Sequence, residues 1–194
     1  MRILAVILAR GGSKRLRNKN IIKLGKQSLL SRTISFAKKY FACKNIIVST
    51  DSKRIADIAK KNQIKIPWLR PKKYSLDKSS SESAVFHALN WYEKKVNKVD
   101  ALVLLQPTTP FRSIRRFKKT MEIFKKNTKK NYVSISKPKD LSSLNGSFYI
   151  ISTREFKKEK AFLTKNSIGI FLKDKKEQID IDTKIDLNRA KSFL

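Results

Sequence analysis

The sequence predicts one α/β domain in which helices cover a mainly parallel sheet. Short apolar runs alternate along the chain with amphipathic stretches, as strands and helices do in this class. The first run, residues 3–8, is apolar at every position, which is typical of a strand buried on both faces. The chain has 194 residues, and neither an internal repeat nor a low-complexity linker marks a boundary. We therefore expect residues 1–194 to form a single domain.

Five strands are expected where apolar and β-branched residues cluster. They cover residues 3–8, 45–49, 101–105, 132–135 and 147–151. Five helices are expected between and after them, at residues 28–40, 52–62, 81–96, 113–126 and 183–194. Ser52 and Ser81 are predicted N-caps because a serine hydroxyl can accept an unpaired N–H of the first turn. Thr183 and Asp186 have the spacing of a capping box.

The chain is strongly basic, with 46 Lys and Arg against 15 Asp and Glu and a formal net charge of +31. Phosphate neutralisation drives non-specific binding to nucleic acids, so this charge suggests a polyanionic partner. The basic residues, however, occur in almost every segment rather than in one tail or one helical stripe. This distribution favours a solvated lysine-rich surface over a nucleic-acid interface. In either case a positive field should speed the capture of small anions.

Other classes of protein are disfavoured by simple patterns. No apolar run approaches the roughly 20 residues of a membrane span, and the run at residues 3–8 is too short for a signal peptide. A single cysteine, Cys43, excludes an internal disulfide and a multi-cysteine zinc site. We expect a cytoplasmic protein. The only histidine, His87, lies in an apolar-patterned helix, and both it and Cys43 are interpreted as structural residues.

Residues 9–20 directly follow the first predicted strand and combine adjacent glycines with basic side chains. Gly11 and Gly12 lack a Cβ atom, so the backbone can turn sharply and direct N–H groups at an anion. Positive charge is added by Arg10, Lys14, Arg15 and Lys19. The spacing is neither that of a Walker A loop nor that of the dinucleotide fingerprint. A phosphate-binding loop and an ordinary lysine-rich turn are the two interpretations.

Three informative segments are expected to converge. Residues 9–20 and 106–110 follow predicted strands, and residues 180–182 precede the last helix. In parallel α/β sheets, ligands bind beyond the carboxyl ends of the strands. The sequence therefore predicts a site at that edge of the sheet.

The loop sequence ILARGGSKRL at residues 7–16, with NKN at 18–20, closely resembles the signature of the acylneuraminate cytidylyltransferases, the CMP-sialic acid synthetase family. Further matches follow in family order at residues 69–71, 77–81, 87–89, 104–110, 145–150, 179–182 and 186–187. The resemblance implies a three-layer, Rossmann-like nucleotidyltransferase fold. It also implies transfer of CMP from CTP to a nine-carbon ulosonic acid such as sialic, legionaminic or pseudaminic acid.

Carried over residue by residue, the resemblance assigns roles to a set of positions. Nucleotide binding is implied for Ala9, Arg10, Gly11, Gly12, Ser13, Lys19, Asn20, Arg70 and Ser81. Sugar binding is implied for Gln106, Asn145 and Phe162, and catalysis for Arg10, Lys19 and Gln106. A Mg²⁺ cofactor is implied at Asp180 and Asp182.

Some of these roles have a simpler competitor. Ser81 could be only a helix N-cap, and Ser80 would take its match after a slip of one residue. Asp182 could be only a cap of the last helix.

The sequence departs from the family in two places. Arg17 stands where relatives usually carry proline. Between the predicted strands 132–135 and 147–151, residues 137–144 remain where relatives have a longer dimerisation element. We therefore expect that the family's exchanged dimer does not form and that sugar specificity is altered. Two other functions stay open: a Kdo-type or other sugar nucleotidyltransferase, and a non-catalytic basic protein that binds polyanions on the same fold.

Overall fold

The computed structural model describes residues 1–76 and 78–194. Its centre is a six-stranded sheet in the order β4-β1-β5-β7-β6-β8. The strands are β1 (Ile3–Leu8), β4 (Ile46–Ser49), β5 (Ala101–Leu105), β6 (Asn131–Ile135), β7 (Leu144–Ser152) and β8 (Ser167–Phe171). Only β7 runs antiparallel to its neighbours, so the predicted mainly parallel sheet is confirmed. Asp77, which belongs to one of the family matches, lies outside the described residues.

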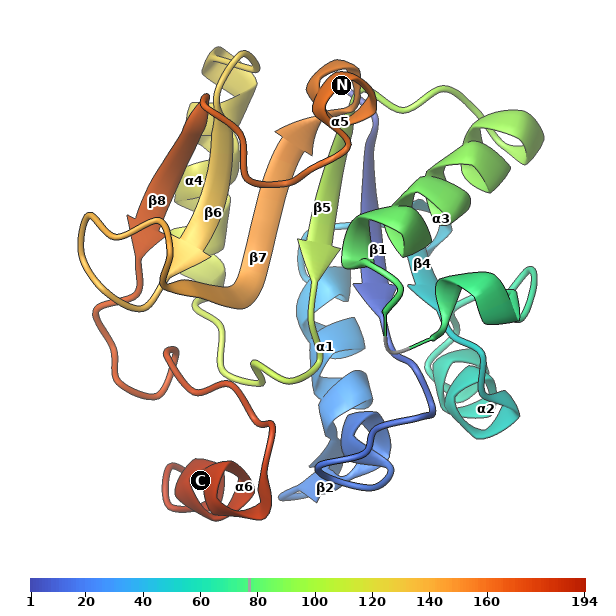
Figure 1. The fold of residues 1–194 in the computed structure, drawn as a ribbon, viewed down its shortest axis with the longest axis vertical. Coiled ribbons are helices and arrows are strands. Elements are labelled where there is room, and N and C mark those ends of the chain that lie inside the picture. The colour runs from blue at the N-terminus through green and yellow to red at the C-terminus, as the bar shows by residue number, and fades with distance from the viewer. Residues whose placement is uncertain (77) are drawn as a thin grey trace.

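Helices cover both faces of this sheet and create three layers (Figure 1). These helices are α1 (Leu29–Lys38), α2 (Lys53–Lys61), α3 (Ser81–Lys95), α4 (Ile114–Lys126) and α5 (Thr153–Glu159). The last helix, α6 (Lys184–Lys191), packs instead in a third cluster with Leu24, Leu29 and Ile181. Alternate residues of β1 enter two separate cores. Ile3, Ala5 and Ile7 pack with α1, α2 and α4, whereas Leu4 and Val6 pack with α3 and α5. The apolar run at residues 3–8 thus reflects burial on both faces.

The five predicted strands and five predicted helices are all present, with ends shifted by a few residues. The structure adds β8, α5 and a short hairpin of β2 (Lys23–Leu24) and β3 (Gln27–Ser28). β8 is a half-exposed edge strand containing Gly169, so it lacks the continuous apolar run of the other strands. α5 has only seven residues, most of them charged or polar, and therefore shows little helical periodicity.

The predicted caps are correct at two helices and wrong at one. Ser52 caps α2, and Thr183 with Asp186 forms the expected capping box at α6. At α3 the N-cap is Ser80, whose hydroxyl accepts the N–H of Ser83, and not Ser81. The helix therefore begins at Ser81, one residue earlier than a cap at Ser81 implies, and Ser80 is the last residue in extended conformation.

The connection between β6 and β7 is a short polar turn. The N–H of Ser136 donates to the Ser143 carbonyl at 2.9 Å, and the Ser143 hydroxyl accepts the Lys137 N–H at 3.0 Å. Among the described residues, no helix is long and apolar enough to cross a membrane.

Candidate active site

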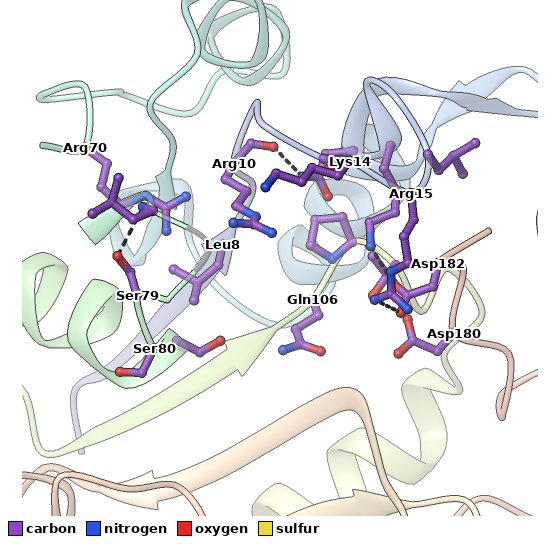
Figure 2. A pocket seen from close by; sticks show the side chains of 18 of the residues that line it. Leu8, Arg10, Lys14, Arg15, Arg70, Ser79, Ser80, Gln106, Asp180 and Asp182 are labelled. Carbon is purple, nitrogen blue, oxygen red and sulfur yellow. Dashed lines mark hydrogen bonds and ion pairs between the residues drawn. The ribbon is translucent and has the colours of Figure 1, made fainter. Parts of the chain in front are cut away.

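A cavity of about 600 Å³ opens at the carboxyl ends of β1 and β5. Both strands run in the same direction, so the segments that follow them meet at one edge of the sheet. Nine of the residues assigned from the family resemblance line this cavity: Arg10, Ser13, Lys19, Asn20, Arg70, Ser81, Gln106, Asp180 and Asp182. Figure 2 labels five of them, namely Arg10, Arg70, Gln106, Asp180 and Asp182. The three segments that were expected to converge therefore share one cavity.

The glycine-containing loop is held by the segment that directly follows β4. The Gly11 N–H donates to the Asp51 carboxylate at 2.8 Å. A Cβ atom on Gly11 would lie 3.0 Å from the Ser52 Cβ, so this close approach favours glycine. Asn20 is buried and donates from its amide to the Arg10 carbonyl at 2.9 Å. These contacts fix both ends of the loop and direct its basic side chains into the cavity (Figure 2).

The two acids predicted to bind a metal ion stand opposite this loop. The Ile181 N–H donates to the Thr108 carbonyl at 2.8 Å, which ties residues 180–182 to the segment after β5. Asp182 accepts from Lys19 Nζ at 2.5 Å and from Arg15 at 2.5 Å. The Asp182 N–H donates in turn to Asp186 of the capping box at 3.1 Å. The end of the chain and its first loop are thereby joined across the cavity.

The carboxyl groups near the cavity titrate differently. Desolvation by the cavity walls is the largest influence on Asp180 and raises its pKa, with Asp182 adding to the rise and a hydrogen bond from Thr108 opposing it. At Asp186, desolvation is outweighed by hydrogen bonds from Thr183 and Asp182, so its pKa is lowered. Protonation therefore reaches Asp180 before Asp186 as the pH falls.

The two carboxylates form a donor set that fits a divalent cation. Asp180 and Asp182 supply hard oxygen ligands of the kind that Mg²⁺ prefers. In residues 1–76 and 78–194, no group of three or more His, Cys, Asp or Glu side chains is arranged to hold a metal. Two carboxylates fit an ion whose remaining ligands are water and phosphate oxygens, which is the usual arrangement of Mg²⁺ with nucleotides.

On the far side of the cavity, Arg70 is a buried cation with unused hydrogen-bonding capacity. Arg70 is 6% exposed, and its backbone N–H donates to the Thr50 carbonyl at 2.6 Å. The guanidinium Nε and Nη2 atoms have no hydrogen-bond partner within the described part of the chain. Burial is the main cause that lowers the pKa of Arg70, and the Asp51 charge opposes this effect. Such unpaired buried donors are costly unless a ligand accepts them.

His87 lies behind this wall and does not line the cavity. Its ring stacks on Trp68 with centroids 5.0 Å apart and an interplanar angle of 21°. Desolvation lowers the pKa of His87, and the charges of Arg70 and Lys73 lower it further. The histidine therefore packs as a neutral aromatic ring at neutral pH.

Other residues assigned from the resemblance lie away from the cavity lining. Ala9, Gly11 and Gly12 belong to the loop but do not line the cavity, and the N–H groups of Ala9 and Gly11 donate within the fold, to the Ser49 carbonyl and to Asp51. Asn145 is 4% exposed, and its amide is used internally, accepting from the Ser147 N–H and donating to the Glu177 carbonyl. Phe162 is 3% exposed and packs on Tyr149 and Phe156 in the core. The structure does not bring these two side chains to the predicted sugar site.

The sequence analysis did not identify three residues that lie outside the cavity lining and hold residues of the site in place. Asp51 anchors Gly11, Gly146 makes room for Gln106, and Arg112 is a half-buried cation that binds the main chain of the loop after β5. Two signals were available in the sequence. Arg112 follows the segment 106–110 that drew attention, and Asp51 directly follows the end of a predicted buried strand.

The sheet order and the cavity at the carboxyl ends of its strands are those of the nucleotide-sugar type of nucleotidyltransferase fold. Residues 4–193 match the family model described as Cytidylyltransferase, and the chain belongs to that family. The predicted family and fold class are thus confirmed, and the chain is a nucleotidyltransferase.

Two curated relatives illustrate the range of the family. The chain is 36% identical over 217 residues to the CMP-N,N'-diacetyllegionaminic acid synthase of Legionella pneumophila, covering 96% of this chain and 93% of that protein. It is 30% identical to the N-acylneuraminate cytidylyltransferase of Escherichia coli, covering 97% of this chain but 51% of that longer protein.

Solved structures agree on the fold. A cytidylyltransferase from Leptospira borgpetersenii superposes with a TM-score of 0.71 at 18% identity, covering 99% of this chain and 86% of that one. A CMP:2-keto-3-deoxy-manno-octonic acid synthetase complexed with CTP superposes with a TM-score of 0.72 at 12% identity, covering 100% and 98%.

Proposed function

We propose that the protein transfers CMP from CTP to the anomeric hydroxyl of a nine-carbon ulosonic acid and releases pyrophosphate. The observation that carries this proposal is the single cavity in which a basic glycine loop faces two carboxylates and a glutamine. The named relatives act on legionaminic and acylneuraminic acids, and both align over nearly the whole of this chain. CTP is a cytoplasmic metabolite, so a cytoplasmic location is part of the same proposal.

The triphosphate would bind along residues 9–20. Arg10 and Lys19 line the cavity from this loop, and the backbone N–H of Gly12 can supply a further donor, since those of Gly11 and Ser13 already donate to Asp51 and to the Gly11 carbonyl. Negative charge moves onto the leaving pyrophosphate during transfer. Fixed cations there stabilise the transition state more than the ground state.

The cytosine would bind at the opposite wall. Cytosine offers a carbonyl oxygen and a ring nitrogen as acceptors, and the guanidinium of Arg70 has two unpaired donor atoms. Ser80 and Ser81 also line this wall, at the start of α3. The buried guanidinium would then obtain the partners that it lacks in the free protein.

A magnesium ion is part of the proposal, at Asp180 and Asp182. When bound, it would neutralise phosphate oxygens and help to align them. Lys19 and Arg15 now neutralise Asp182, so these two side chains must turn toward the triphosphate for the carboxylate to serve as a ligand. The loop cations and the two acids thus act on the same phosphates from opposite sides.

The acceptor acid would lie beside Gln106, whose amide can both donate to and accept from sugar hydroxyls. The anomeric oxygen attacks the α-phosphorus of CTP, a new P–O bond forms, and the bond to the β-phosphate oxygen breaks in line. Pyrophosphate leaves and the hydroxyl proton is released. Holding both reactants in one cavity supplies much of the rate, because attack becomes effectively intramolecular.

A pyrophosphate-release panel tests the proposal. CTP, UTP, ATP and GTP are each combined with N,N'-diacetyllegionaminic acid, N-acetylneuraminic acid, pseudaminic acid or Kdo, in the presence of Mg²⁺. We expect release only with CTP and a nine-carbon acid. Release with Kdo alone would support the Kdo-type alternative, and the absence of release with every pair would refute the proposed activity.

A further inference from the structure

Gln106 is held by its backbone at the point where β5 ends. Its N–H donates to the Gly146 carbonyl at 3.3 Å. Its carbonyl accepts the Thr109 N–H at 3.3 Å and the Thr109 hydroxyl at 3.0 Å, and also the Nη2 of Arg112. Three donors therefore converge on one carbonyl oxygen, which is more than an ordinary loop residue receives.

Arg112 is the central group of this arrangement. Its Nε donates to the Ser147 carbonyl at 2.8 Å, its Nη1 to the Thr33 hydroxyl at 3.2 Å, and its Nη2 to the Thr109 hydroxyl at 3.0 Å. The guanidinium also lies 5.5 Å from the centre of the Phe36 ring. These hydrogen bonds all go to neutral oxygens on α1, β7 and the loop after β5.

Placing a cation in this position is costly. Burial lowers the pKa of Arg112 to about 9, with the Asp180 charge opposing that effect, so the side chain still carries its charge at neutral pH. A charge that has lost much of its water is tolerated only where its hydrogen-bond partners are fixed. The same rigidity that satisfies Arg112 therefore fixes the main chain of Gln106.

Gly146 determines where the side-chain amide of Gln106 can lie. Its φ of +80° is a conformation that favours glycine. A Cβ atom at this position would lie 2.0 Å from the Oε1 of Gln106. The missing side chain is therefore the space that the glutamine amide occupies.

We infer that Arg112, Thr109 and Gly146 are positioning residues that hold the Gln106 amide at the acceptor end of the cavity. None of the three lines the cavity, so they act through Gln106 rather than on a substrate. This inference rests on the proposed function, in which Gln106 orients the sugar acid. A purely structural role for the same residues, as a brace between α1, β5 and β7, makes a different prediction.

Two isosteric variants distinguish the positioning role from the purely structural role. Thr109 and Thr33 are both fully buried, and each accepts a hydrogen bond from Arg112, but only Thr109 also donates to the Gln106 carbonyl. Thr109→Val should raise the KM for the sugar acid about ten-fold while leaving CTP affinity within about two-fold. Thr33→Val, the matched control, removes one of the four Arg112 hydrogen bonds and none to Gln106, so it should leave both values within about two-fold. Equal changes in the two variants would overturn the inference.

A double-mutant cycle sharpens the test. In a Gln106→Ala background, Thr109→Val should have no further effect on the sugar KM, since the group that it positions is gone. A full additional effect would show that Thr109 acts independently of Gln106. Melting temperatures of all variants are measured in parallel, so that a loss of folded protein is recognised.

A spectroscopic readout is independent of the reaction. The side-chain amide cross-peaks of Gln106, assigned in ¹H–¹⁵N spectra by their loss in Gln106→Ala, should shift in Thr109→Val and in Gly146→Ala but not in Thr33→Val. Unmoved cross-peaks in both of the first two variants would refute the inference even if the enzyme is active. If the pyrophosphate assay fails while the shifts occur, the positioning stands and the proposed function does not.

Discussion

Replacing Lys19 with methionine removes one cation from the cavity while keeping most of the side-chain volume. Lys19 Nζ lies 2.5 Å from Asp182, and the lysine side chain is 17% exposed. If Lys19 binds the triphosphate, Lys19→Met should lower kcat/KM about 100-fold, or ~2.7 kcal/mol, as loss of one charged donor to a transition state does. The loss reflects charge that develops on the leaving pyrophosphate.

The effect on stability should be much smaller. The Lys19–Asp182 pair is partly exposed, and Arg15 remains to neutralise Asp182, so the variant should lose about 1 kcal/mol or less. For a protein of this size that corresponds to a fall in melting temperature of about 2–4 °C. The expected loss of transition-state stabilisation is therefore clearly larger than the expected loss of folding stability.

Steady-state pyrophosphate release and thermal unfolding measure the two quantities. Lys38→Met is the matched control, because it removes the same charge from an exposed lysine outside the cavity, where Nζ contacts the Asn62 carbonyl at 3.1 Å. The control should keep its activity within about two-fold. Similar losses in both variants, or less than about three-fold loss in Lys19→Met, would refute the assignment of Lys19 to the triphosphate.

Three further predictions concern the acids and the assembly. Asp180→Asn and Asp182→Asn should each weaken Mn²⁺ binding in the presence of CTP about ten-fold or more, as followed by electron paramagnetic resonance; Asp57→Asn, on an exposed part of α2, is the control, and unchanged binding in both cavity variants would contradict the metal site. The raised pKa of Asp180 means that its charged form costs stability above that pKa, a cost that fades as the pH falls through it and is absent below the ordinary value of 3.8. Asp180→Asn should therefore unfold at a higher temperature than the parent protein at pH 7, with the difference shrinking toward acid pH, and an advantage that grows on acidification would reverse the sign of the argument. Sedimentation at micromolar concentration should give a 22.4 kDa monomer rather than the family's exchanged dimer, and a tight dimer built on residues 137–144 would disprove this expectation.

Most of the fold could be predicted because its signals are local. Burial on both faces makes β1, β4 and β5 continuously apolar, and helical periodicity marks α1 to α4. β8 and α5 escaped prediction because a half-exposed edge strand and a seven-residue helix carry weak patterns. The cap of α3 was misplaced by one residue, since three consecutive serines give the sequence no means to choose among them.

The site residues also fall into those that the sequence predicted correctly and those whose location it did not predict. The glycine-basic loop, Gln106 and the Asp180–Asp182 pair were found because each follows or precedes a recognisable element in a known family order. Phe162 and Asn145 were assigned to the sugar site by the same resemblance, but packing decides where they lie. The structure puts the ring of Phe162 in the core and uses the amide of Asn145 within the fold.

The sequence alone determined the family, the mainly parallel sheet and the chemical character of the cavity, because these depend on residue types and their spacing along the chain. Only the tertiary structure decided that Lys19 neutralises Asp182, which is 163 positions away, and that Gln106 occupies the space left by Gly146. It also decided that Arg112 is a half-buried charge held by four hydrogen bonds rather than one more solvated cation. In a chain with 46 basic residues, charge alone does not distinguish a functional cation from a solvated one. The distinction comes from distances between segments that fold together and from the water that each side chain loses.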